Sequence, residues 1–226
     1  MRITKQSKTA RATGALIVNA DDWGRSRSAE STDRTVECIR AGSVSSVRTM
    51  VFMADSARAS HIAKAQGIDA GLHLKVTCPL NASNVSPALA CRQHRLFPHL
   101  HRHRLSHVVF HSGLANQFEY VVLRQFDEYH RLYGPERIDA HHRMHLCTNV
   151  IHAKLLPPGT IVRRNSSFAT GEKFLAKLVS RRFVDRRLAS RQILSDDFFS
   201  LTARELRRLA KICSLAAHSV VEVETQ

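Results

Sequence analysis

The sequence has few cysteines, few aromatic residues and no long hydrophobic run, and each shortage excludes a class of protein. The five cysteines form no Cys-x-x-Cys pair and are odd in number, which argues against a disulfide framework or a zinc finger and predicts reduced thiols in a cytoplasmic protein. With one Trp and three Tyr, an aromatic platform for stacking nucleic-acid bases is not expected. Apolar runs such as residues 50–54 fall well short of the ~20 residues of a transmembrane helix.

Basic residues exceed acidic ones, giving a net charge of +15. Many of the arginines lie in two segments, 174–191 and 204–212, where they recur among apolar residues. This spacing is typical of the solvated faces of amphipathic helices. We therefore expect non-specific attraction to polyanions at low salt but no specific nucleic-acid binding. A basic nucleic-acid-binding protein is the least favoured alternative.

The length of 226 residues and a hydrophobic content of 43% suit one globular domain. Residues 1–13 contain four basic side chains and no acidic one. Because the apolar segment that follows, 16–18, is too short for a secretory signal, we interpret residues 1–13 as a flexible basic N-terminal arm. A single domain is then expected over residues 14–226.

Apolar runs rich in β-branched residues alternate with segments of helical period along most of the chain. Helices are predicted over 29–41 and 56–66, each followed by a glycine, and an apolar stripe from Phe118 to Tyr129 predicts another that ends near Gly134. The segment 79–98 is predicted to be a loop. Strands are predicted over 16–20, 44–52, 70–76, 137–140, 160–162 and 220–223. This order indicates an α/β fold with mainly parallel strands, in a sheet or a barrel, whose ligands lie at the carboxyl ends of the strands.

Polar residues occur where three of these strands end. Asp21 and Asp22 close the first, His73 lies in the third, and the later strand runs into 139–145, which reads DAHHRMH. Neighbouring strand residues point to opposite faces, so the two aspartates can share a site only if the strand ends there, as Gly24 suggests. A carboxylate and two imidazoles form a ligand set for a divalent ion.

Each feature also has an ordinary structural explanation. The aspartate pair could be a solvated turn with a capping role, His73 could be a hydrogen-bonded histidine of a barrel strand, and 139–145 could be a polar loop. Each ordinary explanation accounts for one feature only. A metal site accounts for all three features and for their position at the same end of the sheet.

A second group of histidines alternates with arginines and has no acidic residue nearby, so a cation would be repelled there. We interpret these side chains as surface residues: His94, His99, His101, His103 and His107.

Three segments together carry a family resemblance: 16–24 (LIVNADDWG), 71–74 (GLHL) and 139–145 (DAHHRMH). The chain resembles the YdjC-like carbohydrate deacetylases, which include chitooligosaccharide deacetylases and deacetylases associated with hopanoid biosynthesis. The resemblance runs from about residue 14 to the end. It implies a deformed (β/α) barrel of the polysaccharide-deacetylase type, that is, a single deacetylase-like barrel domain. It also implies a metal-dependent hydrolase that removes N-acetyl groups from an amino-sugar-containing carbohydrate or glycolipid by attack of a metal-bound water.

Roles carry over from the family to matching residues. Asp22, His73 and His141 match the metal ligands and Asp21 matches the base. The expected cofactor is one divalent ion, Mg²⁺ or Zn²⁺, because this ligand set accepts several metals. The expected partner is an acetylated amino sugar, oligosaccharide or glycolipid. The sequence does not determine the oligomeric state, and a homodimer is one option.

Two positions depart from the family pattern. Arg143 stands where a further histidine is usual, and Gln226 stands where the family has the histidine of a His-Pro pair that is expected to act as the acid. An amide cannot donate a proton as an acid. His142 and His145 are therefore a secondary site that could take this role.

The same departure predicts that the C-terminal part of the domain is incomplete and that the final strand frays. The alternative function is a catalytically impaired homologue that binds metal or carbohydrate without turnover.

Overall fold

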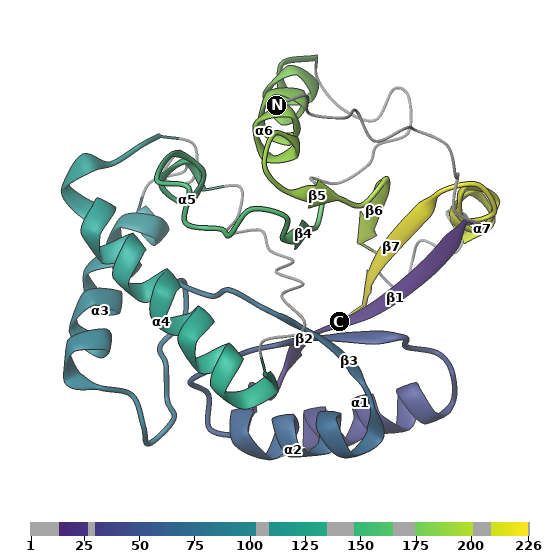
Figure 1. The fold of residues 1–226 in the computed structure, drawn as a ribbon, viewed down its shortest axis with the longest axis horizontal. Coiled ribbons are helices and arrows are strands. Elements are labelled where there is room, and N and C mark those ends of the chain that lie inside the picture. Colours follow the sequence, from purple (N-terminus) through teal and green to yellow (C-terminus); the bar gives the residue numbers. More distant parts are fainter. Residues whose placement is uncertain are drawn as a thin grey trace, which may run out of the picture.

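The fold was analysed in a computed structural model, which describes residues 14–26, 30–102, 109–134, 147–164, 175–200 and 209–225. Strands and helices alternate through most of these ranges (Figure 1). The strands are β1 (Ala15–Trp23), β2 (Ser46–Thr49), β3 (Asp69–Leu72), β4 (Ile161–Val162), β5 (Ile193–Leu194), β6 (Asp197–Ser200) and β7 (Val220–Thr225). The helices are α1 (Glu30–Arg40), α2 (Ser56–Gln66), α3 (Pro87–Arg102), η1 (Ser112–Leu114), α4 (Ala115–Tyr133), α5 (Thr148–His152), α6 (Leu175–Ala189) and α7 (Leu209–Ala216).

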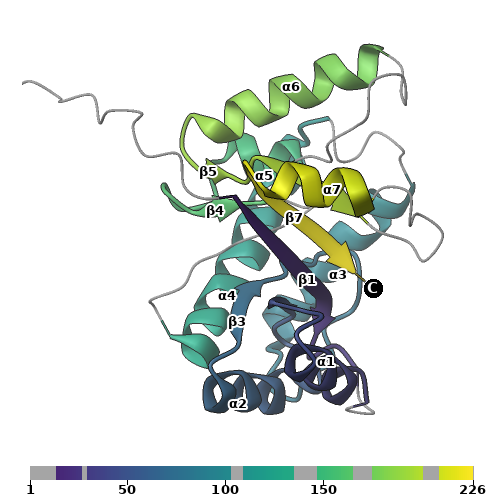
Figure 2. The same cartoon turned by 90° about the vertical axis from the view of Figure 1, so that its right-hand side faces the viewer.

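Five strands form one sheet in the order β3-β2-β1-β7-β6, and every neighbouring pair in it is parallel. The first and last strands of the chain are therefore neighbours, with Ala15 opposite Val220 and Ala20 opposite Thr225. β4 and β5 form a second, parallel pair. In Figures 1 and 2 the helices lie around the outside and the strands toward the middle. The expected mainly parallel α/β fold is thus confirmed.

Alternation along the strands divides apolar from polar side chains. On the outer side of the sheet, Val47 and Trp23 pack with Ala59 of α2, and Val221 packs with Ile212 of α7. The other face carries mostly polar residues, which are Asn19, Asp21, Ser46, Arg48, Glu222 and Glu224. Period-two alternation produces this division, because successive side chains point to opposite faces. The largest apolar cluster instead joins α3, α4 and α5 to the chain after β3.

The prediction of a loop over 79–98 is wrong from Pro87 onward, because α3 begins there. Leu89, Leu96 and Leu100 are buried against α4, and this stripe at helical spacing was obscured by the surrounding polar residues. Pro98 lies inside α3. Of the histidine group, His94 and His101 are exposed as expected, whereas His99 is half-buried and His103 and His107 lie outside the described residues.

The prediction that the final strand frays is wrong. β7 pairs with β1 through Thr225 and with β6 through Glu224, and Val221 to Glu224 are buried. The short strands β5 and β6 were not predicted, because two to four residues give too little alternation to detect. The predicted strand 137–140 and the predicted arm 1–13 lie outside the described residues.

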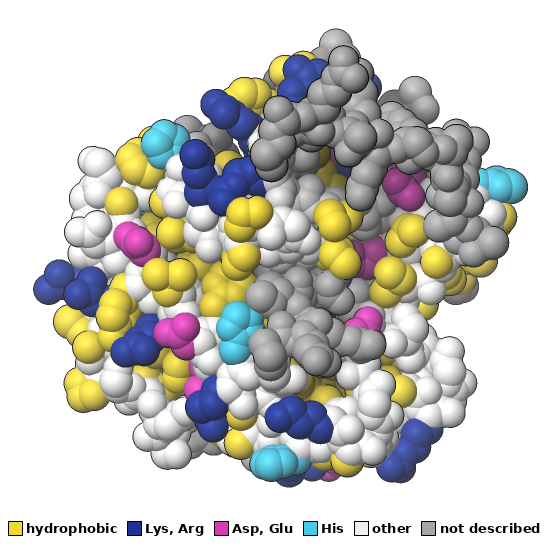
Figure 3. Space-filling model, viewed as in Figure 1, with side chains coloured by type: hydrophobic (Ala, Val, Ile, Leu, Met, Phe, Trp, Pro, Cys, Tyr) yellow, Lys and Arg dark blue, Asp and Glu magenta, His cyan; other side chains and the backbone are white. Residues whose placement is uncertain are grey.

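The surface shows how the basic residues are distributed. Figure 3 shows Lys and Arg side chains scattered over one face among apolar and uncharged groups. This distribution is typical of solvated side chains on that face. Within the described ranges, no helix is both long enough and apolar enough to cross a bilayer.

Candidate functional site

The two aspartates lie at an irregularity of β1. Ala20 is opposite Val47 and Trp23 is opposite Thr49, so both aspartates face the single residue Arg48 on β2. This two-against-one pairing is a β-bulge. Asp22 has a φ of 62°, a left-handed conformation that aspartate adopts more readily than most residues. The bulge, rather than the end of the strand, brings the adjacent carboxylates to one site.

His73 lies between the two carboxylates, just beyond the carboxyl end of β3. Its Nδ1 is 3.8 Å from Asp21 Oδ2, and its Nε2 is 3.7 Å from Asp22 Oδ1. The His73 backbone N–H donates to the Thr49 carbonyl at 2.7 Å, which continues the β2–β3 ladder and fixes the main chain at His73. The structure therefore brings Asp21, Asp22 and His73 together at the carboxyl ends of β1 and β3.

Asp21 is almost fully buried and is held by two arginines. Arg163 donates from Nη2 to Oδ1 at 3.0 Å and from Nη1 to Oδ2 at 3.2 Å, a bidentate pair. Arg48 Nε is 3.6 Å from Oδ1. Burial alone would raise the pKa of Asp21, but the charge and hydrogen bonds of Arg163, together with His73 and Arg48, hold the pKa below its ordinary value. Asp21 is therefore a carboxylate at neutral pH.

Asp22 is more accessible and carries different partners. Lys75 Nζ is 3.2 Å from its Oδ1, and Arg25 Nη1 donates to its Oδ2 at 2.6 Å. Burial would raise the pKa of Asp22, whereas the charges of His73 and Lys75 lower it, with a net lowering. Asp22 is thus also ionised at neutral pH and attracts cations.

Burial determines the protonation of His73. It lowers the pKa of His73 to about 4, against the opposing charges of Asp21 and Asp22. The imidazole is consequently neutral at neutral pH, the form that can ligate a metal.

This low pKa predicts how stability depends on pH. Unfolded His73 titrates near 6.5 and the folded group near 4, so the unfolded chain binds the extra proton between these values. The contribution is present above about pH 6.5 and is lost as the pH falls through 4, by at most about 3 kcal/mol. Urea unfolding of the chelator-treated protein should show this slope, and His73→Gln should flatten it. Identical slopes in the two proteins would contradict the buried neutral histidine.

The donor atoms fit a divalent ion in chemistry and spacing. Two ligands at about 2.1 Å from one ion can lie up to about 4 Å apart, and His73 Nε2 and Asp22 Oδ1 are 3.7 Å apart. Among the described residues, no three His, Cys, Asp or Glu side chains form a complete metal-binding group. The third predicted ligand, His141, lies outside those residues.

The secondary site lies outside the described residues as well. His142 and His145 fall in the same segment as His141, as does Arg143, and Gln226 follows the last described residue. The group that would protonate the leaving amine therefore stays a prediction.

Sequence reasoning missed Arg163 and Lys75, although signals for both were present. Arg163 directly follows the predicted strand 160–162, so it occupies a carboxyl end, the position used to select the aspartates. Lys75 is two residues after His73 within the predicted strand 70–76, where alternation would place both on one side. Neither residue type ligates a metal, so a search for ligands does not select them.

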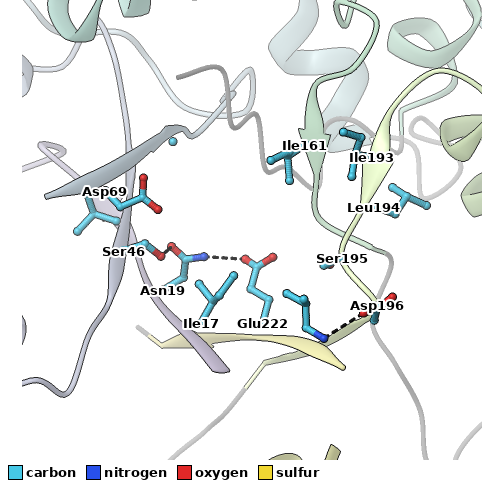
Figure 4. A pocket seen from close by; sticks show the side chains of 13 residues that line it. Ile17, Asn19, Ser46, Asp69, Ile161, Ile193, Leu194, Ser195, Asp196 and Glu222 are labelled. Atoms are coloured by element: carbon cyan, nitrogen blue, oxygen red, sulfur yellow. Dashed lines mark hydrogen bonds between the residues drawn. The ribbon is translucent and has the colours of Figure 1, made fainter. Parts of the chain in front are cut away.

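A cavity of about 280 Å³ is lined on one side by β1, β2, β3 and β7 and on the other by β4, β5 and the residues after β5 (Figure 4). Ser46 and Asp69 begin β2 and β3, and Val220 begins β7. Its lining residues are Ile17, Asn19, Ser46, Val47, Asp69, Gly71, Ile161, Ile193, Leu194, Ser195, Asp196, Val220 and Glu222. Asp21, Asp22 and His73 are not among them, so this cavity is distinct from the carboxylate site.

Comparisons with known proteins bear on both the family and the fold. The sequence profile of the family described as YdjC-like protein matches residues 15–198. A solved structure from Enterococcus faecalis V583, titled a "putative cellobiose-phosphate cleavage protein", is similar with a TM-score of 0.61 and 17% identity, over 95% of this chain and 81% of that one. At this identity the likeness supports the fold alone. No curated protein matches the sequence.

Proposed function

Because this chain belongs to the YdjC-like protein family, which is related to carbohydrate deacetylases and hydrolases, we propose that it is a metal-dependent carbohydrate N-deacetylase. Its substrate would be an acetylated amino sugar within an oligosaccharide or glycolipid, and its products acetate and the free amine. The family is shown by the sequence profile, and the metal dependence and the reaction are what we propose.

The observation that carries the proposal is the convergence of Asp21, Asp22 and His73 at the β1 bulge. Adjacent carboxylates normally diverge from a strand, and here both lie within 4 Å of one neutral imidazole. Asp21 is held by arginines and Asp22 faces solvent more openly. Their surroundings differ, as expected for two carboxylates with two roles.

In this proposal Asp22 and His73, with His141, hold the ion, and Asp21 is the base. The bound ion would polarise the acetyl carbonyl and acidify a water. Asp21 accepts a proton from the attacking water at a carboxylate oxygen, and Arg163 keeps that carboxylate oriented. Departure of the amine then requires a proton from a separate acid, for which His142 and His145 are the candidates.

One observation favours the second candidate, a homologue that binds without turnover. Lys75 and Arg25 already neutralise Asp22, so a metal must compete with an ammonium and a guanidinium there. A weakened ion site would leave the fold intact and slow the reaction.

Acetate release tests the proposal and its alternative together. N,N′-Diacetylchitobiose and longer N-acetylglucosamine oligomers would be incubated with the protein before and after chelation, and after Mg²⁺ or Zn²⁺ is restored. We expect release that disappears with chelator and returns with metal. One tightly bound ion per chain without release would support the binding-only alternative, and no bound ion at saturating metal would refute the ligand set.

A further inference from the structure

Glu222 lies in the middle of β7 and is completely buried, yet it is a carboxylate among valines. Its nearest charged partners are the guanidinium groups of Arg48 and Arg163. We propose that Glu222 is a positioning residue, which holds the Arg163 guanidinium in the orientation that presents Asp21 to the reaction. This inference rests on the proposed deacetylase function.

The contacts of Arg163 identify which group orients it. Its Nε donates to Glu222 Oε1 at 2.9 Å, while Nη1 and Nη2 donate to the two oxygens of Asp21. Glu224 accepts a longer bond from Nη1 at 3.3 Å, and the Phe198 ring lies 4.4 Å from the guanidinium carbon. The guanidinium is planar, so fixing Nε at one edge and Phe198 on one face leaves a single direction for the other edge. That direction is toward Asp21.

Charge gives Glu222 a second effect on Arg163. Glu222 Oε1 also accepts a hydrogen bond from Arg48 Nη2, so one carboxylate oxygen lies between two buried guanidinium groups. Like charges in a poorly screened interior repel strongly. Without the Glu222 charge, Arg48 and Arg163 would separate, and both contact Asp21.

Glu222 is itself fixed from the other strands. Asn19 Nδ2 donates to Glu222 Oε1 at 2.8 Å, and Ser46 Oγ donates to Asn19 Oδ1 at 2.7 Å (Figure 4). The chain of contacts thus runs from Ser46 on β2 through β1 and β7 to Arg163, which follows β4, and back to Asp21. Hydrogen bonds among three strands, β1, β2 and β7, therefore restrict where the Glu222 carboxylate can lie.

The central test is Glu222→Gln, which keeps the shape and one acceptor oxygen but removes the charge. We expect kcat for acetate release to fall about 10- to 100-fold, the usual effect of losing a supporting contact behind a reactive group. KM should stay within about twofold, because Glu222 does not touch the substrate in this assignment. Metal affinity should be unchanged, since the ligands are not altered, and Glu222→Asp should restore part of kcat.

Glu128→Gln is the matched control. Glu128 also accepts from an arginine Nε, that of Arg131 at 2.7 Å, and from an asparagine amide, that of Asn84 at 2.9 Å, and it is mostly buried on α4. Glu128→Gln therefore removes a buried carboxylate charge with the same kinds of partner, none of which contacts Asp21. Its kcat should equal that of the unchanged protein, and both variants should be compared by thermal unfolding.

Two results separate positioning from a structural role. In an Arg163→Lys background, Glu222→Gln should cost little further kcat, because its effect passes through the guanidinium; an equal loss in both backgrounds would overturn the proposal. Nitrogen-15 NMR of the arginine Nε–H groups, with the Arg163 signal assigned by Arg163→Lys, should show faster hydrogen exchange in Glu222→Gln. An unchanged Arg163 signal would also overturn it.

The NMR result does not require turnover. A chain that releases no acetate would refute the deacetylase function, and the NMR readout would still decide whether Glu222 orients Arg163.

Discussion

Asp21→Asn is expected to lower kcat for acetate release by about 10²- to 10⁴-fold, the usual contribution of a general base. The asparagine side chain has nearly the same shape but cannot accept the proton from water. Metal binding should persist, because Asp22, His73 and His141 are left in place. Both quantities would be measured on the same preparation, by acetate assay and by metal content after dialysis.

The matched control for this variant is Asp127→Asn. Asp127 is an exposed aspartate of α4 whose oxygen lies 3.5 Å from Arg124, so Asp127→Asn loses only a solvent-exposed ion pair and should keep full activity. Because Asp21 is buried against Arg163, thermal unfolding must show that Asp21→Asn remains folded at the assay temperature. A folded Asp21→Asn protein with kcat within tenfold of the unchanged chain would exclude Asp21 as the base.

Arg163→Gln is expected to destabilise the fold by about 3–5 kcal/mol, the typical result of removing one partner from a buried ionic group. Three buried carboxylates contact this guanidinium, those of Asp21, Glu222 and Glu224. Without it they repel one another in a poorly screened interior, and Arg48 alone cannot neutralise them. Urea unfolding at pH 7 would measure the loss.

The same variant has a pH signature. Arg163 is the main group that lowers the pKa of Asp21 against burial, so its removal should raise that pKa. A raised folded pKa favours the protonated native state, and the stability difference from the unchanged protein should therefore shrink as the pH falls from 7 toward 5. Arg131→Gln, which removes a largely exposed arginine paired with Glu128, should cost less than about 1 kcal/mol. If Arg163→Gln also lowered the free energy of unfolding by less than about 1 kcal/mol, the Arg163 ion pairs would not stabilise the fold as proposed.

Much of the fold follows from local pattern. The run of β-branched residues in β1 and the helical spacing of apolar residues in α4 each need only short-range information, and both elements form where they were predicted. α3 was missed because its buried leucines are separated by histidines and arginines that hid the stripe. β5 and β6 were missed because so few residues carry no measurable period.

The aspartate pair shows the limit of local reasoning at the site. The sequence predicted that Asp21 and Asp22 share a site because the strand ends there, and this reason is wrong, since β1 continues to Trp23. The sequence did not show that the carboxylates meet at a bulge against Arg48, since a bulge depends on the register with β2, a neighbour 27 residues away at Asn19 and Ser46. His73 could be predicted near them because carboxyl ends of parallel strands share one edge.

By itself, the sequence determined the YdjC-like family and the parallel α/β fold, and it selected Asp21, Asp22 and His73 as candidates, because motif and periodicity are properties of short segments. Only the tertiary structure decided which charges surround those residues. Arg163 is 142 residues from Asp21, and Glu222 is 59 residues from Arg163. A buried ion pair depends on three-dimensional distance and on exclusion of water, neither of which a linear pattern records.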